Sequence, residues 1–326
     1  MNILVTGGTG FLGQHLAQAL KTQGHDVSIL GRDFTRVKDL LAAGIRPISV
    51  DLRDETAVRQ ACRGMDIIYH AGALSAAWGK RSDFYAINVG GTQAVIAGCR
   101  EHGIKRMIYV SSPSVVFAGK DVRNASEDVP YPRRFLSAYA LSKKRGEDLV
   151  NAAASSMETV IIRPKAIFGP GDRTLLPQLL HVARHSRLPQ IGNGQNLVDL
   201  TYVENVVHAL LLALDAQAAP GKTYTITNDE HIPLWDVIRQ ALRHVDLPTN
   251  LRPIPLPAAL AVAALMELQA TLTGKEPLLT RYSAAILGCT QTYNIAAAKR
   301  DLGYEPRISV AEGIRRTLET LRRQDG

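Results

Sequence analysis

The sequence opens with M-N-I-L-V-T-G-G-T-G-F-L-G, residues 1–13, and this stretch decides the fold. Residues 3–5 are apolar and predict a short buried strand, and a helical pattern follows over residues 11–23. The turn between them contains three glycines at three-residue spacing: Gly7, Gly10 and Gly13. Such glycines allow a sharp turn, a close approach of backbone to a ligand, and tight packing of helix on sheet. The unpaired N–H groups at the helix start suit a pyrophosphate, so the stretch predicts dinucleotide binding rather than a structural turn alone.

Composition bounds the class of protein. The chain has 326 residues, of which 46% are hydrophobic and 21% charged, as in a soluble globular protein of one large domain or two smaller ones. The three cysteines lack C-x-x-C spacing, so we expect neither a disulfide framework nor a zinc site. H-E-x-x-H and G-x-S-x-G motifs are also missing from the sequence, which disfavours metal-dependent and serine hydrolase chemistry. We therefore predict no metal.

Charge and hydropathy exclude other classes. The net charge is +8, but the basic residues are scattered and do not indicate nucleic-acid binding. A strand that starts almost at Met1 leaves no room for a signal peptide, so the expected location is cytoplasmic. The longest apolar run, Leu256 to Met266, is shorter than the roughly 20 residues of a membrane span. It predicts a core helix or a helix that lines an apolar pocket, with a membrane-surface helix as the alternative.

Strand and helix patterns alternate through the first half of the chain. Further strands are predicted at residues 27–30, 46–51, 66–70, 107–111 and 159–163. Helices are predicted at residues 34–43, 55–62, 84–101 and 138–155. Apolar strands separated by helices favour an α/β fold, a Rossmann-type doubly wound parallel sheet with its ligand at the carboxyl ends of the strands.

The alternating pattern changes after Pro164. Residues 174–186 look helical, residues 197–202 and 222–227 resume strand character, and helical and proline-rich segments follow. We interpret this as a smaller C-terminal substrate lobe built from several segments. The predicted division is residues 1–166 plus 197–229 for the Rossmann domain, and residues 167–196 plus 230–326 for the substrate-binding lobe.

The end of the second strand bears on the choice of cofactor. An acidic residue in this place would bind the ribose 2′-hydroxyl of NAD, but the sequence has Gly31 and Arg32. A guanidinium suits a 2′-phosphate, so NADP(H) is preferred, with NAD(H) possible because Asp33 follows. Arg36 could assist on the next helical turn. At the end of the third strand, Asp51 with Leu52 could reach the adenine, or Asp51 could cap the next helix.

Tyr139 and Lys143 lie four residues apart in a predicted helix, so their side chains share a face. A nearby ammonium lowers the pKa of a phenol, and such a tyrosine can exchange a proton with an alcohol or ketone as a hydride moves. Lys143 could also hold the nicotinamide ribose. Ser111 and Ser112 end the fifth strand, where a hydroxyl could hydrogen-bond the reacting oxygen or could cap the turn before Pro113.

Several segments together resemble the extended short-chain dehydrogenase/reductases over essentially the whole chain. They are T-G-G-T-G-F-L-G, H-A-G-A from His70, N-V-G-G-T from Asn88, Y-V-S-S from Tyr109, the Tyr139–Lys143 pair, and R-P-K-A-I-F-G-P-G-D from Arg163. The segments S-S-P-S-V-V-F-A-G and I-G-N-G-Q-N-L-V-D-L-T-Y-V-E-N-V-V-H-A resemble the 3β-hydroxysteroid dehydrogenase branch, including sterol-4α-carboxylate 3-dehydrogenases (decarboxylating). A-G-A-L-S-A-A-W-G and E-P-L-L-T-R-Y are similar to bacterial 2-alkyl-3-oxoalkanoate reductases.

The resemblance implies a role for individual residues. Tyr139 is the acid/base, Lys143 its partner, and Ser112 orients the oxygen, with Ser111 as a one-residue alternative. Asn88 would tie neighbouring strand ends together. The residues implied to contact the cofactor are Gly7, Gly10, Phe11, Leu12, Gly13, Arg32, Asp51, Leu52, Ala71, Ala73, Tyr139, Lys143, Pro164 and Ile167.

The resemblance also implies an activity. The expected protein is an NADP(H)-dependent oxidoreductase that interconverts a secondary alcohol and a ketone on a steroid-like or long-chain β-keto acid substrate. The alternatives are a nucleotide-sugar epimerase or dehydratase with tightly bound NAD(P), and a non-catalytic NADP-binding regulator. A homodimer is implied through the helices at residues 84–101 and 138–155. Lys165 or the Arg133–Arg134 loop could meet a substrate carboxylate, and the candidates to line the pocket are Trp78, Phe84, Phe117, Phe135 and Tyr202.

Overall fold

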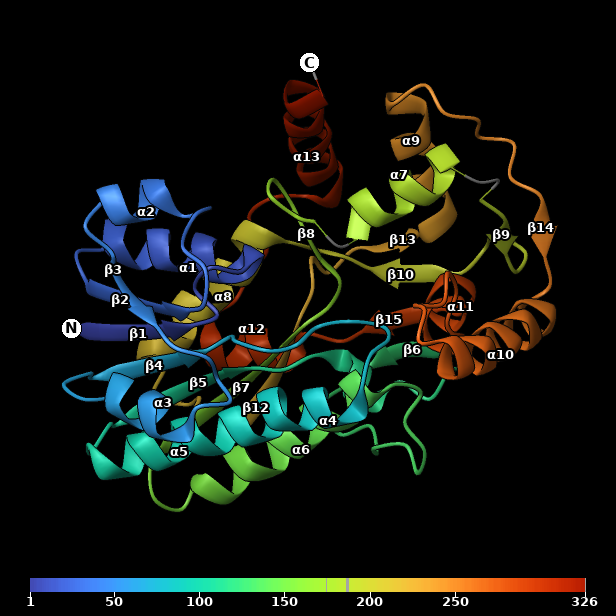
Figure 1. Ribbon diagram of the computed structural model, residues 1–326. Helices are drawn as coiled ribbons and strands as arrows, with labels where there is room; N and C mark the ends of the chain where they lie inside the picture. The colour runs from blue at the N-terminus through green and yellow to red at the C-terminus, as the bar shows by residue number, and fades with distance from the viewer. Residues whose placement is uncertain (174, 186–187, 326) are drawn as a thin grey trace.

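A computed structural model describes residues 1–173, 175–185 and 188–325. Figure 1 shows a large twisted sheet between layers of helices, with a smaller lobe beside it that carries α7, α9, α10 and α11. The larger part is a Rossmann-type α/β fold, which confirms the predicted fold class.

The large sheet has seven strands in the order β12-β7-β5-β4-β1-β2-β3. All six strand pairs are parallel. The bounds are β1 Asn2–Thr6, β2 Asp26–Gly31, β3 Arg46–Ser49, β4 Ile67–His70, β5 Arg106–Val110, β7 Glu158–Pro164 and β12 Lys222–Ile226. The order reverses direction between β1 and β4, and ligands of such sheets bind at the carboxyl ends of the strands at this point.

Helices cover both faces of this sheet. On one face α3 packs on α5, and α5 packs on α6; on the other, α1 packs on α2 and α8 (Figure 1). Their bounds are α1 Phe11–Thr22, α2 Lys38–Ala42, α3 Glu55–Ala61, α5 Gly91–Glu101, α6 Ala138–Ala153 and α8 Val203–Asp215. Because both faces are covered, β1, β4 and β5 are buried along nearly their whole length, which explains their continuous apolar sequences.

The smaller lobe is built on a four-stranded sheet in the order β13-β10-β15-β6, with two-stranded pairs β11-β8 and β14-β9 nearby. Its strands are β6 Val122–Ala125, β8 Ile167–Phe168, β9 Gln190–Ile191, β10 Leu197–Asp199, β11 Thr201–Tyr202, β13 His231–Pro233, β14 Pro253–Ile254 and β15 Gln291–Tyr293. Its core includes Trp235 and Leu242 from α9. The remaining helices are α4 Arg81–Phe84, α7 Leu175–His185, α9 Leu234–His244, α10 Leu256–Thr273, α11 Arg281–Gly288, α12 Ala296–Leu302 and α13 Val310–Asp325.

The division into two domains stays a prediction. The strand pairing of residues 197–202 bears on the segment 197–229, which was assigned to the Rossmann domain. Residues 197–202 form two short strands, of which β10 lies in the four-stranded sheet and β11 pairs with β8. The following helix α8 and strand β12 belong to the large sheet and its cover. The helix expected over residues 174–186 appears as α7, with residues 174 and 186 outside the described residues.

Two predicted helices differ from the structure. The helix expected over residues 34–43 is only α2, because the Asp33 side chain accepts a hydrogen bond from Thr35 N at 2.9 Å and holds a turn there. The helix expected over residues 84–101 is interrupted by a π-helical segment, Tyr85–Gly90, between α4 and α5. Such π segments are frequent at functional sites, and this one carries Asn88.

Helix α10 contradicts the prediction of a core helix. It is 18 residues long, and only Ala259, Ala263, Glu267 and Ala270 are buried. Leu265 and Leu272 are 68% and 79% exposed. By length and composition α10 is apolar enough to cross a membrane, and 22% of it is buried within the protein. The small residues on its buried face allow α10 to pack closely against α11, while most of its leucines lie at the surface.

Candidate active site

The turn between β1 and α1 has the shape of a phosphate-binding loop. Gly7 has φ of +68°, and a Cβ there would lie 2.6 Å from Gly72 Cα, so no other residue fits. A Cβ on Gly13 would lie 2.2 Å from Gly7 O, which shows how closely α1 approaches the turn. Gly10 is the N-cap residue of α1 and has no side chain to occupy the space there. A Cβ added to Gly10 would meet only Gly7 O within 4 Å, at 3.1 Å. The first N–H groups of α1 are thus available to an anion, and the loop fits a pyrophosphate.

Several of the predicted cofactor residues lie around this turn. A Cβ on Gly72 would lie 2.8 Å from Leu52 Cδ1, which places Leu52 against the loop after β4. Leu12, Ala71 and Ile167 are partly buried and pack on one core cluster. The loop after β8 reaches the start of α1, where His15 Nε2 lies 3.0 Å from Pro170 O and the Phe11 ring packs edge-on to His15. Residues far apart in sequence therefore converge at the carboxyl ends of β1, β4 and β7.

Arg32 and Asp51 face each other across the ends of β2 and β3. Their nearest side-chain atoms, Arg32 Nη1 and Asp51 Oδ2, lie 3.7 Å apart, and the Arg32 side chain is 68% exposed. Asp51 accepts hydrogen bonds from Arg53, which hold the pKa of its carboxyl at about 2 against the opposing effect of burial. The alternative in which Asp51 caps the next helix is wrong, because Asp54 accepts the hydrogen bond from Ala57 N and caps α3.

Tyr139 occupies the first turn of α6, where Ser137 caps the helix by accepting a hydrogen bond from Ala140 N at 3.1 Å. Burial raises the pKa of the Tyr139 phenol above its usual value, and hydrogen bonds with Ser75 and Ser112 oppose that rise. The phenol is therefore protonated near neutral pH, and it lies against the predicted Ser112. Ser75 is a site residue that the sequence analysis missed.

Lys143 lies one helical turn after Tyr139 and is fully buried. Its Nζ donates to Val110 O at 2.7 Å and lies 4.0 Å from the centre of the Tyr109 ring. Burial lowers the pKa of Lys143 to about 7, and Glu147 one turn further along α6 opposes the shift. The expected lowering of the Tyr139 pKa by Lys143 is not among the causes that act on that phenol.

The two serines after β5 have different surroundings. Ser112 contacts Tyr139 and also caps the short 3₁₀ helix Pro113–Val116 by accepting a hydrogen bond from Ser114 N at 3.2 Å, which confirms the capping role. Ser111 is buried, and its Oγ has no hydrogen-bond partner among the described residues. Asn88 clamps the loop after β4: its Oδ1 accepts from Leu74 N at 2.6 Å, and its Nδ2 donates to Ser142 Oγ at 2.9 Å. Ala73 immediately precedes the clamped Leu74.

Two buried networks support the site without having been predicted. In the first, His70 Nδ1 lies 2.6 Å from Thr6 Oγ1, and His70 Nε2 lies 3.0 Å from Thr92 Oγ1. These two hydrogen bonds link β1, β4 and α5. Burial, with Lys143 nearby, lowers the pKa of His70 to about 3, so the ring is neutral. In the second, Arg163 on β7 makes two hydrogen bonds of 2.8 Å to Glu147 on α6, and Tyr131 OH donates to the same carboxylate at 2.8 Å.

The residues expected to line a substrate pocket divide into two groups. Phe84, Phe117 and Tyr202 are fully buried and belong to the core, while Trp78 and Phe135 are partly exposed. Tyr282 on α11 was missed: burial raises the pKa of its phenol, and the proximity of Tyr139 adds to the rise. The smaller lobe therefore contributes directly to the surroundings of Tyr139.

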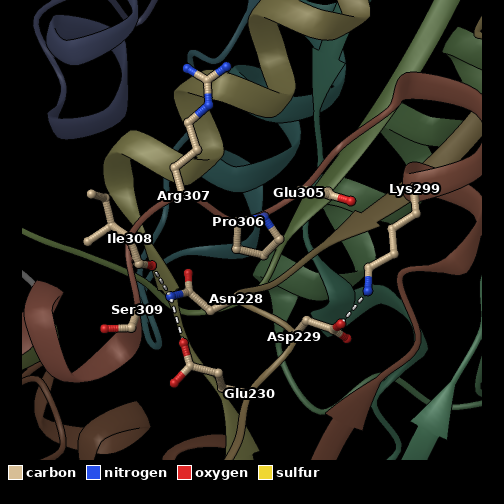
Figure 2. A pocket seen from close by; sticks show the side chains of 9 residues that line it. All are labelled: Asn228, Asp229, Glu230, Lys299, Glu305, Pro306, Arg307, Ile308 and Ser309. Atoms are coloured by element: carbon tan, nitrogen blue, oxygen red, sulfur yellow. Dashed lines mark hydrogen bonds and ion pairs between the residues drawn. The ribbon is translucent and has the colours of Figure 1, made fainter.

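A surface depression of about 480 Å³ lies elsewhere, beside the loops after β12 and α12 (Figure 2). Its polar groups pair with one another. Asn228 Nδ2 donates to Ile308 O at 2.7 Å, and Lys299 forms an ion pair with Asp229. The residues that line it include none of the predicted site residues, so the depression is separate from the Tyr139 site.

The parallel sheet, the glycine turn and the Ser112–Tyr139 contact with Lys143 one turn on define the class: a Rossmann-fold oxidoreductase of the extended short-chain dehydrogenase/reductase type. Comparison with known proteins narrows the class. Residues 4–257 match the model of the 3-beta hydroxysteroid dehydrogenase/isomerase family, and the chain belongs to this family.

Individual relatives agree with the family. The chain is 40% identical to a 2-alkyl-3-oxoalkanoate reductase from Stenotrophomonas maltophilia, over 97% of this chain and 98% of the relative. It is 34% identical to the sterol-4-alpha-carboxylate 3-dehydrogenase, decarboxylating, of Mus musculus, over 97% and 90%. Among solved structures, UDP-glucuronic acid 4-epimerase from Bacillus cereus in complex with NAD superposes with a TM-score of 0.80 at 22% identity, over the full length of both chains. That likeness shows the shared fold.

Proposed function

We propose that this protein is an NADP(H)-dependent oxidoreductase that interconverts a secondary alcohol and a ketone on a large apolar substrate. The substrate class is a long-chain β-keto acid or a 4-carboxysterol-like 3β-hydroxysteroid. The observation that carries the proposal is the hydrogen bond between the Tyr139 phenol and Ser112, on the helix that also bears Lys143. The names of the relatives support the substrate class, since one reduces a 2-alkyl-3-oxoalkanoate and another oxidises a sterol 4α-carboxylate.

The cofactor is assigned from the residues that would hold it. The α1 N-terminus would bind the pyrophosphate, Leu52 and Ala71 would flank the adenosine side, and Lys143 would bind the nicotinamide ribose. Arg32 would pair with the 2′-phosphate, because its exposed guanidinium lies at the end of β2 where the ribose of such cofactors is bound. The bound cofactor supplies or accepts the hydride.

The proton transfer is assigned to Tyr139. In the reducing direction, Ser112 donates a hydrogen bond to the ketone oxygen, and Tyr139 gives its proton to that oxygen as the carbon is reduced. The raised pKa of Tyr139 keeps the phenol protonated and suits it as the proton donor. In the oxidising direction the same atoms act in reverse, and Tyr139 must first lose its proton before it can accept the proton of the alcohol.

Substitution of the phenol tests the proposal. Tyr139→Phe should lower kcat by about 10²–10⁴-fold, the usual contribution of a positioned acid, while the Kd for NADPH changes less than about threefold. Tyr224→Phe is the matched control, because that phenol lies on the edge strand β12 and contacts Ala218 O and Asp301. Near-normal turnover by Tyr139→Phe would refute the mechanism.

The same assay separates the epimerase alternative. An epimerase or dehydratase with tightly bound cofactor would convert nucleotide sugars without net consumption of added NADPH. The proposed oxidoreductase consumes one NADPH for each ketone reduced. The full-length structural likeness to an epimerase reflects the fold, and fold alone does not decide between these reactions.

A further inference from the structure

Lys165 is a buried lysine with few partners. It directly follows Arg163-Pro164 at the end of β7, and the residue is 9% exposed. Its Nζ donates to Gln291 Oε1 on β15 at 2.7 Å, which is its one hydrogen-bond acceptor in the part of the chain that the structure describes. A lysine ammonium has three donor hydrogens, so this group retains capacity for an additional acceptor.

The charge of Lys165 is only partly balanced. Burial lowers the pKa of Lys165 to about 8, and the carboxylate of Asp199 opposes the shift. The Asp199 carboxylate has other partners: Oδ1 lies 2.6 Å from His231 Nδ1, and Oδ2 accepts a hydrogen bond from Tyr293 N at 2.7 Å. Asp199 forms no hydrogen bond with Lys165. The buried ammonium of Lys165 can therefore bind and stabilise a second anion.

Lys165 lies beside the catalytic residues. Strand β7 pairs with β5, where Val110 stands opposite Ile162 and Ser111 N donates to Ile162 O at 2.7 Å. The residues that follow, Ser112 on one strand and Lys165 on the other, leave the same edge of the sheet from neighbouring strands about 4.8 Å apart. Lys165 and Ser112 therefore follow neighbouring strands at the same end of the sheet.

Tyr293 on β15 connects Lys165 to the smaller lobe. The ring centre of Tyr293 lies 5.8 Å from Lys165 Nζ, and the residue is 2% exposed. Its hydroxyl has no hydrogen-bond partner among the described residues. Burial raises the pKa of Tyr293, and the proximity of Tyr282 adds to the rise, while Tyr282 is in turn close to Tyr139. The buried Tyr293 hydroxyl close to Lys165 is therefore a donor that no described residue uses.

We propose that Lys165, with the hydroxyl of Tyr293, binds a substrate carboxylate located β to the reacting alcohol or ketone. The proposal deepens the proposed function and rests on it for the position of the reacting carbon. A carboxylate has two oxygens and can accept from the ammonium and the phenol at once. The exposed Arg133 and Arg134 fit this role less well, because water and salt screen a charge at the surface.

Binding measurements test the carboxylate site without requiring turnover. The full-length protein saturated with NADPH is titrated with 3-hydroxydecanoate and with its methyl ester, which differ in charge and which NADPH cannot reduce. We expect the wild type to bind the acid at least about tenfold more tightly than the ester, as for a hydrogen bond to a charged group. Lys165→Met should bind the acid no better than the ester, with ester affinity unchanged, and Lys165→Arg should retain most of the preference.

Tyr293→Phe provides a second variant that removes only the unpartnered hydroxyl and leaves the buried charges in place. It should weaken acid binding about threefold to tenfold and leave ester binding unchanged. Equal affinity of the wild type for acid and ester would overturn the carboxylate site, and so would an equal loss of both ligands in Lys165→Met.

NADPH consumption with a 2-alkyl-3-oxo acid and its methyl ester distinguishes the two proposals. Lysine-dependent binding of the acid without any NADPH consumption would leave the site standing and refute the proposed reaction. If NADPH were consumed with equal kcat/KM for acid and ester, and Lys165→Met changed neither value, the carboxylate site would be refuted and the proposed reaction would stand.

Discussion

In the proposed cofactor assignment, Arg32 is the residue that would select NADP(H) over NAD(H). Arg32 directly follows β2, and its exposed guanidinium lies 3.7 Å from the carboxylate of Asp51. A hydrogen bond from Thr35 N to the Asp33 side chain holds the turn that follows. Asp33 is therefore engaged with its own turn, which leaves Arg32 as the residue available to a 2′-phosphate. This is the part of the cofactor assignment that depends on a single side chain.

Arg32→Asp should lower the ratio of kcat/KM for NADPH to that for NADH by about 10–100-fold, because an attraction for the 2′-phosphate becomes a repulsion. The ratio is measured with one ketone substrate and both reduced cofactors. Arg46→Asp is the control, since Arg46 is also exposed but begins β3, next to β2, at the amino end of that strand rather than at its carboxyl end. An unchanged ratio in Arg32→Asp would contradict the preference for NADP(H).

At the scale of single residues, the sequence predicted those side chains that belong to local patterns. The glycine spacing and the Tyr139–Lys143 spacing each lie within a few residues, and the structure places Tyr139 against the predicted Ser112. Ser75, Thr6, Thr92 and Tyr282 were missed because each meets its partner across a long separation, such as the 64 residues between Thr6 and His70. No local spacing encodes such a contact.

At the scale of elements, Glu147 and Arg163 join helix α6 to strand β7. Their side chains are 0% and 4% exposed and share two hydrogen bonds of 2.8 Å. The pair links the helix that carries Tyr139 and Lys143 to the strand that leads into Lys165 and Ile167. Glu147 also raises the pKa of Lys143 against the effect of burial, so it supports both the position and the charge of the site.

Glu147→Gln should lower the free energy of unfolding by about 3 kcal/mol, because it leaves the Arg163 guanidinium buried without its counter-charge. Glu101→Gln breaks the ion pair with Arg59 between α5 and α3, whose side chains are 36% and 42% exposed, and should cost less than about 1 kcal/mol. Urea denaturation of both variants measures the difference. Similar losses in the two would show that the buried pair has no special structural role.

Elements were predicted well where burial dictates the pattern. The central strands β1, β4 and β5 are mostly apolar because helices cover both faces, and each strand of the parallel sheet was found within one or two residues of its predicted bounds. Prediction was wrong where a local polar bond competed, as in the turn at Asp33 that shortens α2. It was also wrong for α10, because its apolar sequence does not reveal that most of its leucines face outward.

At the scale of the whole molecule, the site lies where the two parts meet. The large sheet contributes the glycine turn, Ser112 and Tyr139, while α11 and β15 of the smaller lobe contribute Tyr282 and Tyr293 (Figure 1). The larger part has the fold of a solved structure in complex with NAD, and it contains the residues to which cofactor binding and proton transfer are proposed. The smaller part adds Tyr282 and Tyr293, of which Tyr293 belongs to the proposed carboxylate site.

The central claim is that hydride passes from NADPH to the carbon β to a carboxylate. It is tested most directly with NADPH deuterated at the transferable C4 position and a 2-alkyl-3-oxoalkanoate as substrate, with the product analysed by mass spectrometry. We expect one NADPH consumed per product, and a 3-hydroxy acid that carries one deuterium at C3. Product without deuterium, or conversion without net loss of NADPH, would contradict the claim.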